Sequence, residues 1–192
     1  LRVINDDTVT PSAGFDTHGH RDMEIISYVL QGRIAHKDSA GNIKELPAGE
    51  FQLMSAGKGI YHSEFNASKD ETLKFLQIWI QPNVTGGQPG YQQKAFGENQ
   101  GITTVITPDG ADGTLSIKQN ASVKQLILAP QTQEQYNIPT GRNLYLHQIE
   151  GQLTLNTTTL NPGDGAKITK ESSLTLQNQG TTRVKAIVFD LE

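Results

Sequence analysis

The chain has 192 residues, no cysteine, a formal net charge of -4 and a pI near 5.7. Its 16 lysines and arginines are dispersed, so it lacks the clustered basic surface of a nucleic-acid-binding protein, and no apolar run approaches the roughly 18 residues of a membrane span. The lack of cysteine excludes disulfides and thiolate metal sites. We therefore expect a cytoplasmic monomer that binds neither nucleic acid nor a membrane directly.

Short runs rich in β-branched and aromatic residues recur along the chain, bounded by Gly, Pro, Asn or Asp. Such runs are typical of β-strands, and helical periodicity is hard to find. In chain order they are 1–4, 25–30, 51–54, 73–80, 103–106, 126–128, 144–149 and 185–189. The stretch 82–101 has little apolar patterning and is expected to bridge two halves. The sequence predicts an all-β fold, with further residues expected upstream of Leu1.

Four side chains that can ligate a metal fall into two pairs with the same spacing, His18-x-His20 and His62-x-Glu64. Because successive strand residues point to opposite faces, both members of a pair project to one side of their strand. Two such strands paired in a barrel would gather three imidazoles and one carboxylate. This donor set suits Fe, Ni, Co, Cu or Zn, whereas Mg and Ca prefer oxygen ligands. The pattern predicts a mononuclear metal centre.

The two halves of the chain carry degenerate copies of one pattern. A strand ending at Gly32 and a Pro-Gly turn at Gly49 are echoed at Gly151 and Gly163. Offsets from these glycines place the four ligand positions of the second copy at Asn137, Pro139, Leu176 and Asn178. None of the four ligand types recurs there, so we expect a second half without metal.

The pattern Gly14-x3-His18-x-His20-x3-Glu24-x7-Gly32, followed by Pro47-x-Gly49-x12-His62, resembles the two cupin motifs. The stretch 54–64, Met-Ser-Ala-Gly-Lys-Gly-Ile-Tyr-His-Ser-Glu, more narrowly resembles the pirin family. The resemblance covers essentially the whole chain. It implies a bicupin, in which two antiparallel β-barrels of the double-stranded β-helix or jelly-roll type pack face to face.

The resemblance further implies a metal-binding cupin half over 1–104 and a cupin half without a metal site over 105–192. The metal would be held by the residues matching His18, His20, His62 and Glu64. We expect one divalent transition metal, with Fe(II) first and Ni, Co, Mn, Cu or Zn as alternatives. Pirin-like chains usually carry an additional N-terminal segment that this sequence lacks.

The resemblance to bacterial members of the family implies quercetin 2,3-dioxygenase activity. A flavonol and O2 would be the substrates, and Glu64 would be the catalytic base. Animal members imply iron-dependent transcriptional co-regulation, so the alternative is an iron- or redox-dependent regulatory partner of other proteins. A sugar or small-acid isomerase would need further charged groups near the ligands, and the sequence shows few.

Three other residues compete for a place in the site. Glu24 is the rival of Glu64, but a regular strand would put it roughly 13 Å beyond His20, so we favour Glu64 as the ligand. His36 and His147 have no partner at ligand spacing and are expected to be structural.

Overall fold

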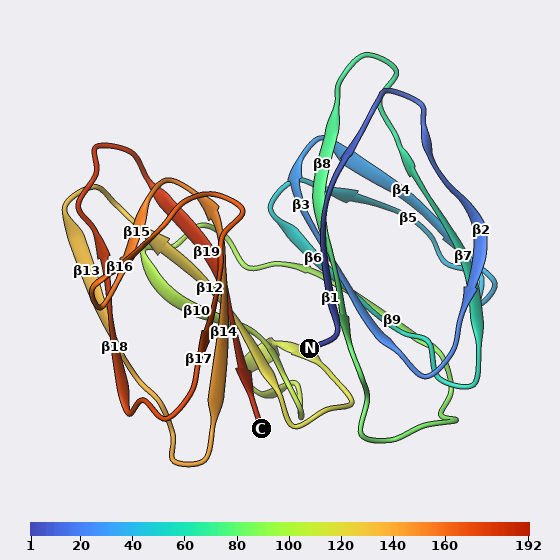
Figure 1. Cartoon of the computed structure of the whole chain (residues 1–192). Coiled ribbons are helices and arrows are strands. Elements are labelled where there is room, and N and C mark those ends of the chain that lie inside the picture. The colour runs from blue at the N-terminus through green and yellow to red at the C-terminus, as the bar shows by residue number, and fades with distance from the viewer. The chain divides into compact units, whose positions relative to one another are not determined.

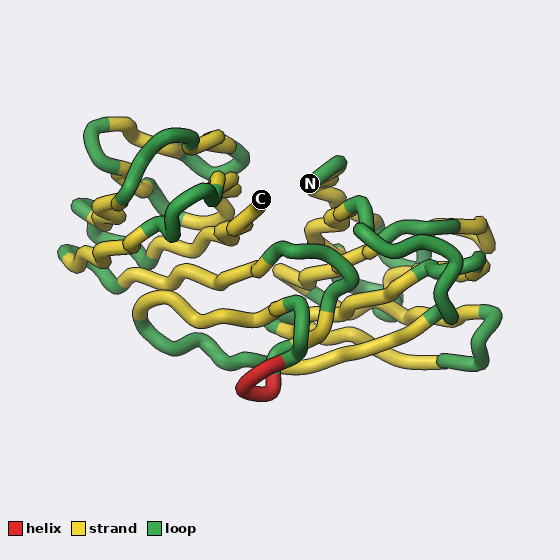
Figure 2. Tube along the Cα trace, turned by 90° about the horizontal axis from the view of Figure 1, so that it is seen from below, coloured by secondary structure: helices red, strands yellow, loops and turns green.

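The computed structural model describes residues 1–192 and consists almost entirely of β-strands, with one short 3-10 helix at Ala111–Gly113 (Figures 1 and 2). The predicted all-β class is confirmed, and every predicted strand-like run lies wholly or partly in a strand. No helix combines the length and the apolar character needed to cross a membrane. The chain divides into two compact units, Leu1–Gly97 with Leu115–Gln119, and Glu98–Thr114 with Asn120–Glu192.

The first unit contains two antiparallel sheets, which form its two layers (Figure 1). The larger sheet has the order β1-β8-β3-β6-β9 and the smaller sheet the order β2-β7-β4-β5. The strands are β1 Val3–Val9, β2 Gly14–His20, β3 Glu24–Gln31, β4 Arg33–Asp38, β5 Ile43–Pro47, β6 Glu50–Ser55, β7 Ile60–Asn66, β8 Leu73–Ile80 and β9 Gly90–Ala95. A two-residue strand, β11 Leu115–Ser116, also belongs to this unit.

The second unit repeats the two-sheet plan. Its larger sheet contains the order β10-β12-β19-β14-β17 and its smaller sheet the order β13-β18-β15-β16. The strands are β10 Gly101–Thr107, β12 Ser122–Leu128, β13 Thr132–Asn137, β14 Asn143–Glu150, β15 Leu153–Leu155, β16 Thr158–Leu160, β17 Gly165–Ile168, β18 Ser173–Asn178 and β19 Val184–Leu191.

The stretch 82–101, which was expected to bridge the two halves, also contains a strand. Strand β9 lies within this stretch and pairs with β6, Met54 facing Tyr91 and Gln52 facing Gln93. Its sequence is largely polar because it forms the sheet edge and most of its residues are exposed or half-buried. Apolar patterning therefore could not reveal it.

The interior of the first unit is polar in the middle and apolar at both ends. Along β3, Ile25 belongs to one apolar cluster and Val29 to another, and Ser27 lies between them. Along β8 the order Trp79, Gln77, Phe75 repeats this sequence of apolar, polar and apolar side chains. A buried polar band therefore crosses the unit, formed by Ser27, His36, Gln52, His62, Glu64 and Gln77.

In each unit one buried asparagine side chain links separate backbone segments by hydrogen bonds, with the same pattern in both units. The Asn66 amide nitrogen donates to three backbone carbonyls, those of Val9, Thr10 and Glu71, and its oxygen accepts from the Ser68 amide. In the second unit the Asn178 amide makes the corresponding bonds to Leu128, Ala129, Thr182 and Gly180. The repeat read from the sequence is thus a structural one, and Asn178 corresponds to Asn66.

Replacing Asn66 with alanine should lower the free energy of unfolding by about 2–3 kcal/mol, because it strips buried backbone carbonyls of their donor. Asn178→Ala should have a similar effect in the second unit. Urea denaturation measures both, with the exposed Asn99→Ala as the control. An effect of Asn66→Ala no larger than that of the control would show that this amide does not close the unit.

Candidate metal centre

Strand β7 carries the second ligand pair, and its register with β2 decides where the first pair points. Phe15 faces Glu64 and His18 faces His62. Three positions separate 15 from 18 whereas two separate 62 from 64, so β2 contains one extra residue, a β-bulge. In a regular ladder Thr17 would lie opposite His62. The bulge brings His18 to the interior face in its place.

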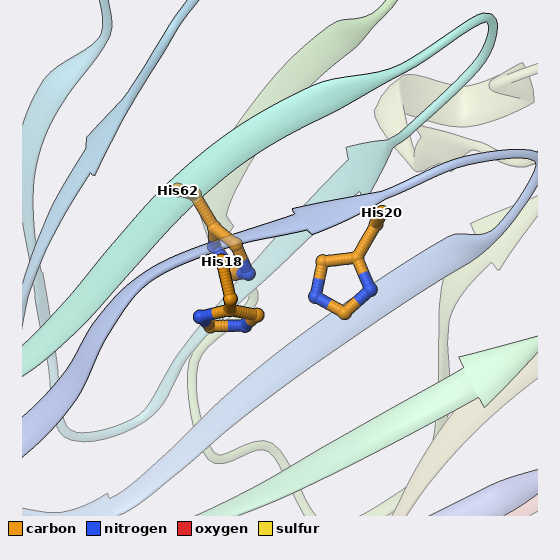
Figure 3. Close-up of side chains that lie close together, drawn as sticks. All are labelled: His18, His20 and His62. Atoms are coloured by element: carbon orange, nitrogen blue, oxygen red, sulfur yellow. The ribbon is translucent and has the colours of Figure 1, made fainter.

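The structure brings His18, His20 and His62 together, as Figure 3 shows. Ring centroids lie 4.9 Å apart for His18 and His20, 4.5 Å for His18 and His62, and 5.0 Å for His20 and His62. One ligand nitrogen from each lies within 4.8 Å of the others. His20 also meets the Trp79 ring edge to face at 5.1 Å.

The hydrogen bonds of this trio leave nitrogen lone pairs available. His18 Nδ1 is paired with the backbone oxygen of Asp16 at 2.8 Å, which is the kind of second contact that orients a metal-binding imidazole. His20 Nε2 and both ring nitrogens of His62 are buried without a hydrogen-bond partner. Buried polar atoms are normally satisfied, so unpartnered imidazole nitrogens facing one another fit a divalent transition metal.

Glu64 lies beside the trio but outside it. Its buried carboxylate accepts hydrogen bonds from Ser27 Oγ at 3.2 Å and from Gln77 Nε2 at 2.8 Å. Burial raises the pKa of Glu64 to about 7, although both hydrogen bonds oppose the shift. The carboxylate therefore sits where it can hold or release a proton near neutral pH.

Burial dominates the electrostatics of the imidazoles as well. It lowers the pKa of His62 to about 3, and the neighbouring His18, His20 and His36 lower it further. Burial also lowers the pKa of His20, with a smaller contribution from His18. The imidazole of His62 is thus neutral at any physiological pH, which is the form that binds a metal.

Glu24 lies on the face of β3 opposite to Ser27, because three positions separate the two residues along the strand. Its carboxylate accepts from Ser55 Oγ at 2.9 Å and from the Lys118 amide at 3.3 Å. It belongs to neither cluster of ligand-type side chains. Glu24 therefore has a buried hydrogen-bonding role away from the imidazoles.

His36 corrects the sequence analysis, which gave it no partner at ligand spacing. It is buried, its Nε2 lies 3.0 Å from Asp38 Oδ2, and its ring centroid lies 5.5 Å from that of His62. The signal was present in the sequence, because His36-x-Asp38 repeats the spacing of the two recognised pairs. His147 lies in the second unit, on β14.

A pocket opens beside the imidazoles and is lined by Asn5, Asp7, Phe15, His18, Glu64, Phe75, Gln77 and Trp79. Its volume is about 100 Å³. Its lining combines three apolar aromatic side chains with five polar ones, which gives it the mixed character of a small-molecule site.

The second unit has leucines at the positions that correspond to His62 and Glu64. Because Asn178 corresponds to Asn66, the counterparts of His62 and Glu64 are Leu174 and Leu176, two residues before the positions that the offsets indicate. The displacement arises because 15 positions separate Gly163 from Asn178, whereas 17 separate Gly49 from Asn66. The pair Ser27 and Gln77, which holds Glu64, has its counterpart in Leu146 and Val188. All four apolar replacements belong to one buried core cluster.

Comparison with known proteins gives concordant matches. The pirin family model matches residues 1–80, and the model of the quercetinase C-terminal cupin domain matches residues 104–191. Quercetin 2,3-dioxygenase from Escherichia coli is 41% identical over 191 residues, which are 100% of this chain and 82% of that protein. A pirin-like protein from Caulobacter vibrioides is 40% identical over 181 residues, 92% of this chain and 77% of that protein.

Among solved structures, the bacterial pirin YhhW from Escherichia coli in complex with nickel(II) is similar with a TM-score of 0.95 and 40% sequence identity. The match covers 100% of this chain and 82% of that chain.

In the metal-free protein, His62 should lower stability as the medium becomes acidic. Its folded pKa of about 3 lies below the unfolded value near 6.5, so its contribution is fully present above pH 6.5 and is lost as pH falls toward 3. The substitution His62→Leu, which introduces the residue found at Leu174 of the second unit, should make stability depend less on pH in this range. The urea midpoints of both proteins at pH 7 and pH 4.5 measure this effect. An equal change in midpoint for the two proteins would contradict the prediction.

Proposed function

This chain belongs to the pirin family, and from that premise we propose that it is a metal-dependent dioxygenase that opens the heterocyclic ring of a flavonol such as quercetin. The observation that carries the proposal is the trio His18, His20 and His62, with unpartnered nitrogens beside the buried carboxylate of Glu64. The names of the relatives supply the reaction class.

The metal would be held by His18, His20, His62 and Glu64, in a cupin half that covers the N-terminal part of the chain. Three nitrogens and one oxygen suit one divalent transition metal, with Fe(II) and Ni(II) as the first ions to test. Such an ion supplies a Lewis acid toward the 3-hydroxyl and neighbouring ketone of the flavonol and lowers the pKa of that hydroxyl.

Glu64 would accept the proton of the flavonol hydroxyl. Ser27 and Gln77 hold its carboxylate at the pocket from the opposite sheet, which fixes the acceptor relative to a bound substrate. Phe15, Phe75 and the Trp79 ring would exclude water from the reacting carbons.

The pocket of about 100 Å³ is smaller than the roughly 300–1,000 Å³ of sites for drug-sized ligands, so we expect one of its walls to move when a flavonol binds. Phe15 is the wall residue best placed to do so, because it lies beside the bulge of β2 and is 41% exposed.

The testing experiment loads the protein with Fe(II), Ni(II), Co(II) or Mn(II) and measures oxygen uptake and carbon monoxide release with quercetin. Uptake and release in equal amounts, dependent on the metal, are expected. Metal binding without either gas signal would favour the regulatory role, in which the metal sets the surface offered to a protein partner.

Glu64→Gln should reduce turnover by about 10²–10⁴-fold, because it removes the general base, whereas part of the metal should remain. Glu24→Gln is the matched control, a buried carboxylate on the other face of its strand, and should retain both metal and turnover. Elemental analysis and oxygen uptake compare the two. If Glu24→Gln empties the site and Glu64→Gln does not, the ligand assignment is wrong.

The protein should bind one equivalent of metal in total. His18→Ala, His20→Ala and His62→Ala should each weaken binding sharply, because removing one ligand of four leaves an open site. His147→Ala should leave the metal content unchanged. Equilibrium dialysis with elemental analysis measures both, and two equivalents, or a loss on His147→Ala, would contradict the assignment.

A further inference from the structure

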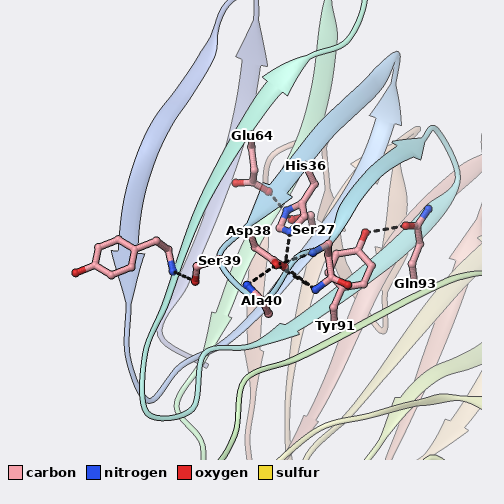
Figure 4. A network of polar contacts seen from close by, with 10 residues as sticks. Ser27, His36, Asp38, Ser39, Ala40, Glu64, Tyr91 and Gln93 are labelled. Atoms are coloured by element: carbon pink, nitrogen blue, oxygen red, sulfur yellow. Dashed lines mark hydrogen bonds and ion pairs between the residues drawn. The ribbon is translucent and has the colours of Figure 1, made fainter.

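A second cluster of ligand-type side chains lies deeper in the first unit. His36, His62 and Glu64 are all buried, and one ligand atom of each lies within 4.8 Å of the others. Strand pairing explains the cluster, because β4 pairs with β7 so that His36 faces Glu64 and Asp38 faces His62. Figure 4 shows His36 between Glu64 and Asp38.

His36 has the contacts of an oriented metal ligand. Its Nε2 is paired with Asp38 Oδ2 at 3.0 Å, and Asp38 is itself fixed by the Ala40 amide and by the amide and side chain of Asn42. A metal-binding histidine typically donates its other ring N–H to such a carboxylate. The remaining nitrogen of His36, Nδ1, is buried without a hydrogen-bond partner.

His62 offers one nitrogen more than a single ion uses. Both of its ring nitrogens are buried and unpartnered, whereas His18 has a backbone oxygen on its Nδ1. The trio with His18 and His20 accounts for one nitrogen of His62. The other is left for a second position.

A purely structural role for His36 explains only half of these facts. Asp38 accepts hydrogen bonds from backbone amides in the turn between β4 and β5, and His36 Nε2 is paired with the same carboxylate. Such a role gives no partner to Nδ1, although buried polar atoms are normally hydrogen-bonded.

We propose that His36, His62 and Glu64 form an inner position for a divalent transition metal, used in alternation with the outer position at His18, His20 and His62. Two nitrogens and one carboxylate suit Zn, Co, Ni or Cu. Glu64 would serve both positions, so the protein holds one ion at a time. Metal binding at the inner position does not require that the protein cleaves a flavonol.

The test separates the two positions by removing the outer one. The double variant His18→Ala, His20→Ala is titrated with Co(II), followed by its visible absorption and by elemental analysis after gel filtration. It should still bind one equivalent, more weakly than the parent and with a changed spectrum. Adding His36→Gln, whose amide still donates to Asp38, should abolish this binding, whereas adding His147→Gln in the second unit should not.

A further variant tests the orienting carboxylate. In the same double background, Asp38→Asn should weaken Co(II) binding about 10–100-fold, with thermal melting by circular dichroism showing that each variant remains folded. A folded double variant that binds no Co(II), or one whose binding survives His36→Gln, would overturn the inner position. Because the readout is metal content, neither result depends on whether the protein cleaves a flavonol.

Discussion

The register of β7 between β2 and β4 is the constraint on which the site depends. It sets His62 against His18 on one side and against Asp38 on the other, so that three pairs with the same spacing share one interior face. A slip of β7 by one residue would turn His62 and Glu64 to the outer face. The bulge in β2 is part of the same constraint, because it places His18 rather than Thr17 opposite His62.

The two units differ in the polarity of their interiors. Each unit has an equivalent asparagine, Asn66 or Asn178, with the same hydrogen bonds. The second unit nevertheless fills its interior with leucine and valine, where the first buries imidazoles, a carboxylate and amides. Burying polar groups without full partners is unfavourable. The first unit tolerates this because apolar clusters around Val29 and Ile25 flank the band on both sides.

Sequence reasoning reached the all-β class and the trio of histidines because period-2 alternation gathers side chains at i and i+2 whatever the loops do. The pair His36-x-Asp38 has the same spacing, but spacing alone does not show which strand lies beside it, and only the pairing of β4 with β7 places His36 opposite Glu64. Sequence reasoning misplaced the counterparts of His62 and Glu64 because the segment from Gly163 to Asn178 is two residues shorter than the segment from Gly49 to Asn66. Neither the β2 bulge nor the polar edge strand β9 has a hydrophobic signature.

The polar band depends on side chains from several strands at once. Glu64 is held by Ser27 and Gln77, which lie on the opposite sheet from its own strand, so a working carboxylate needs compatible residues on three strands at once. In the second unit the corresponding places are Leu176, Leu146 and Val188. Changing only Leu176 to glutamate would bury a charge among apolar side chains. A site built on three strands is thus regained only when several substitutions occur together, because a single added charge would be buried without partners.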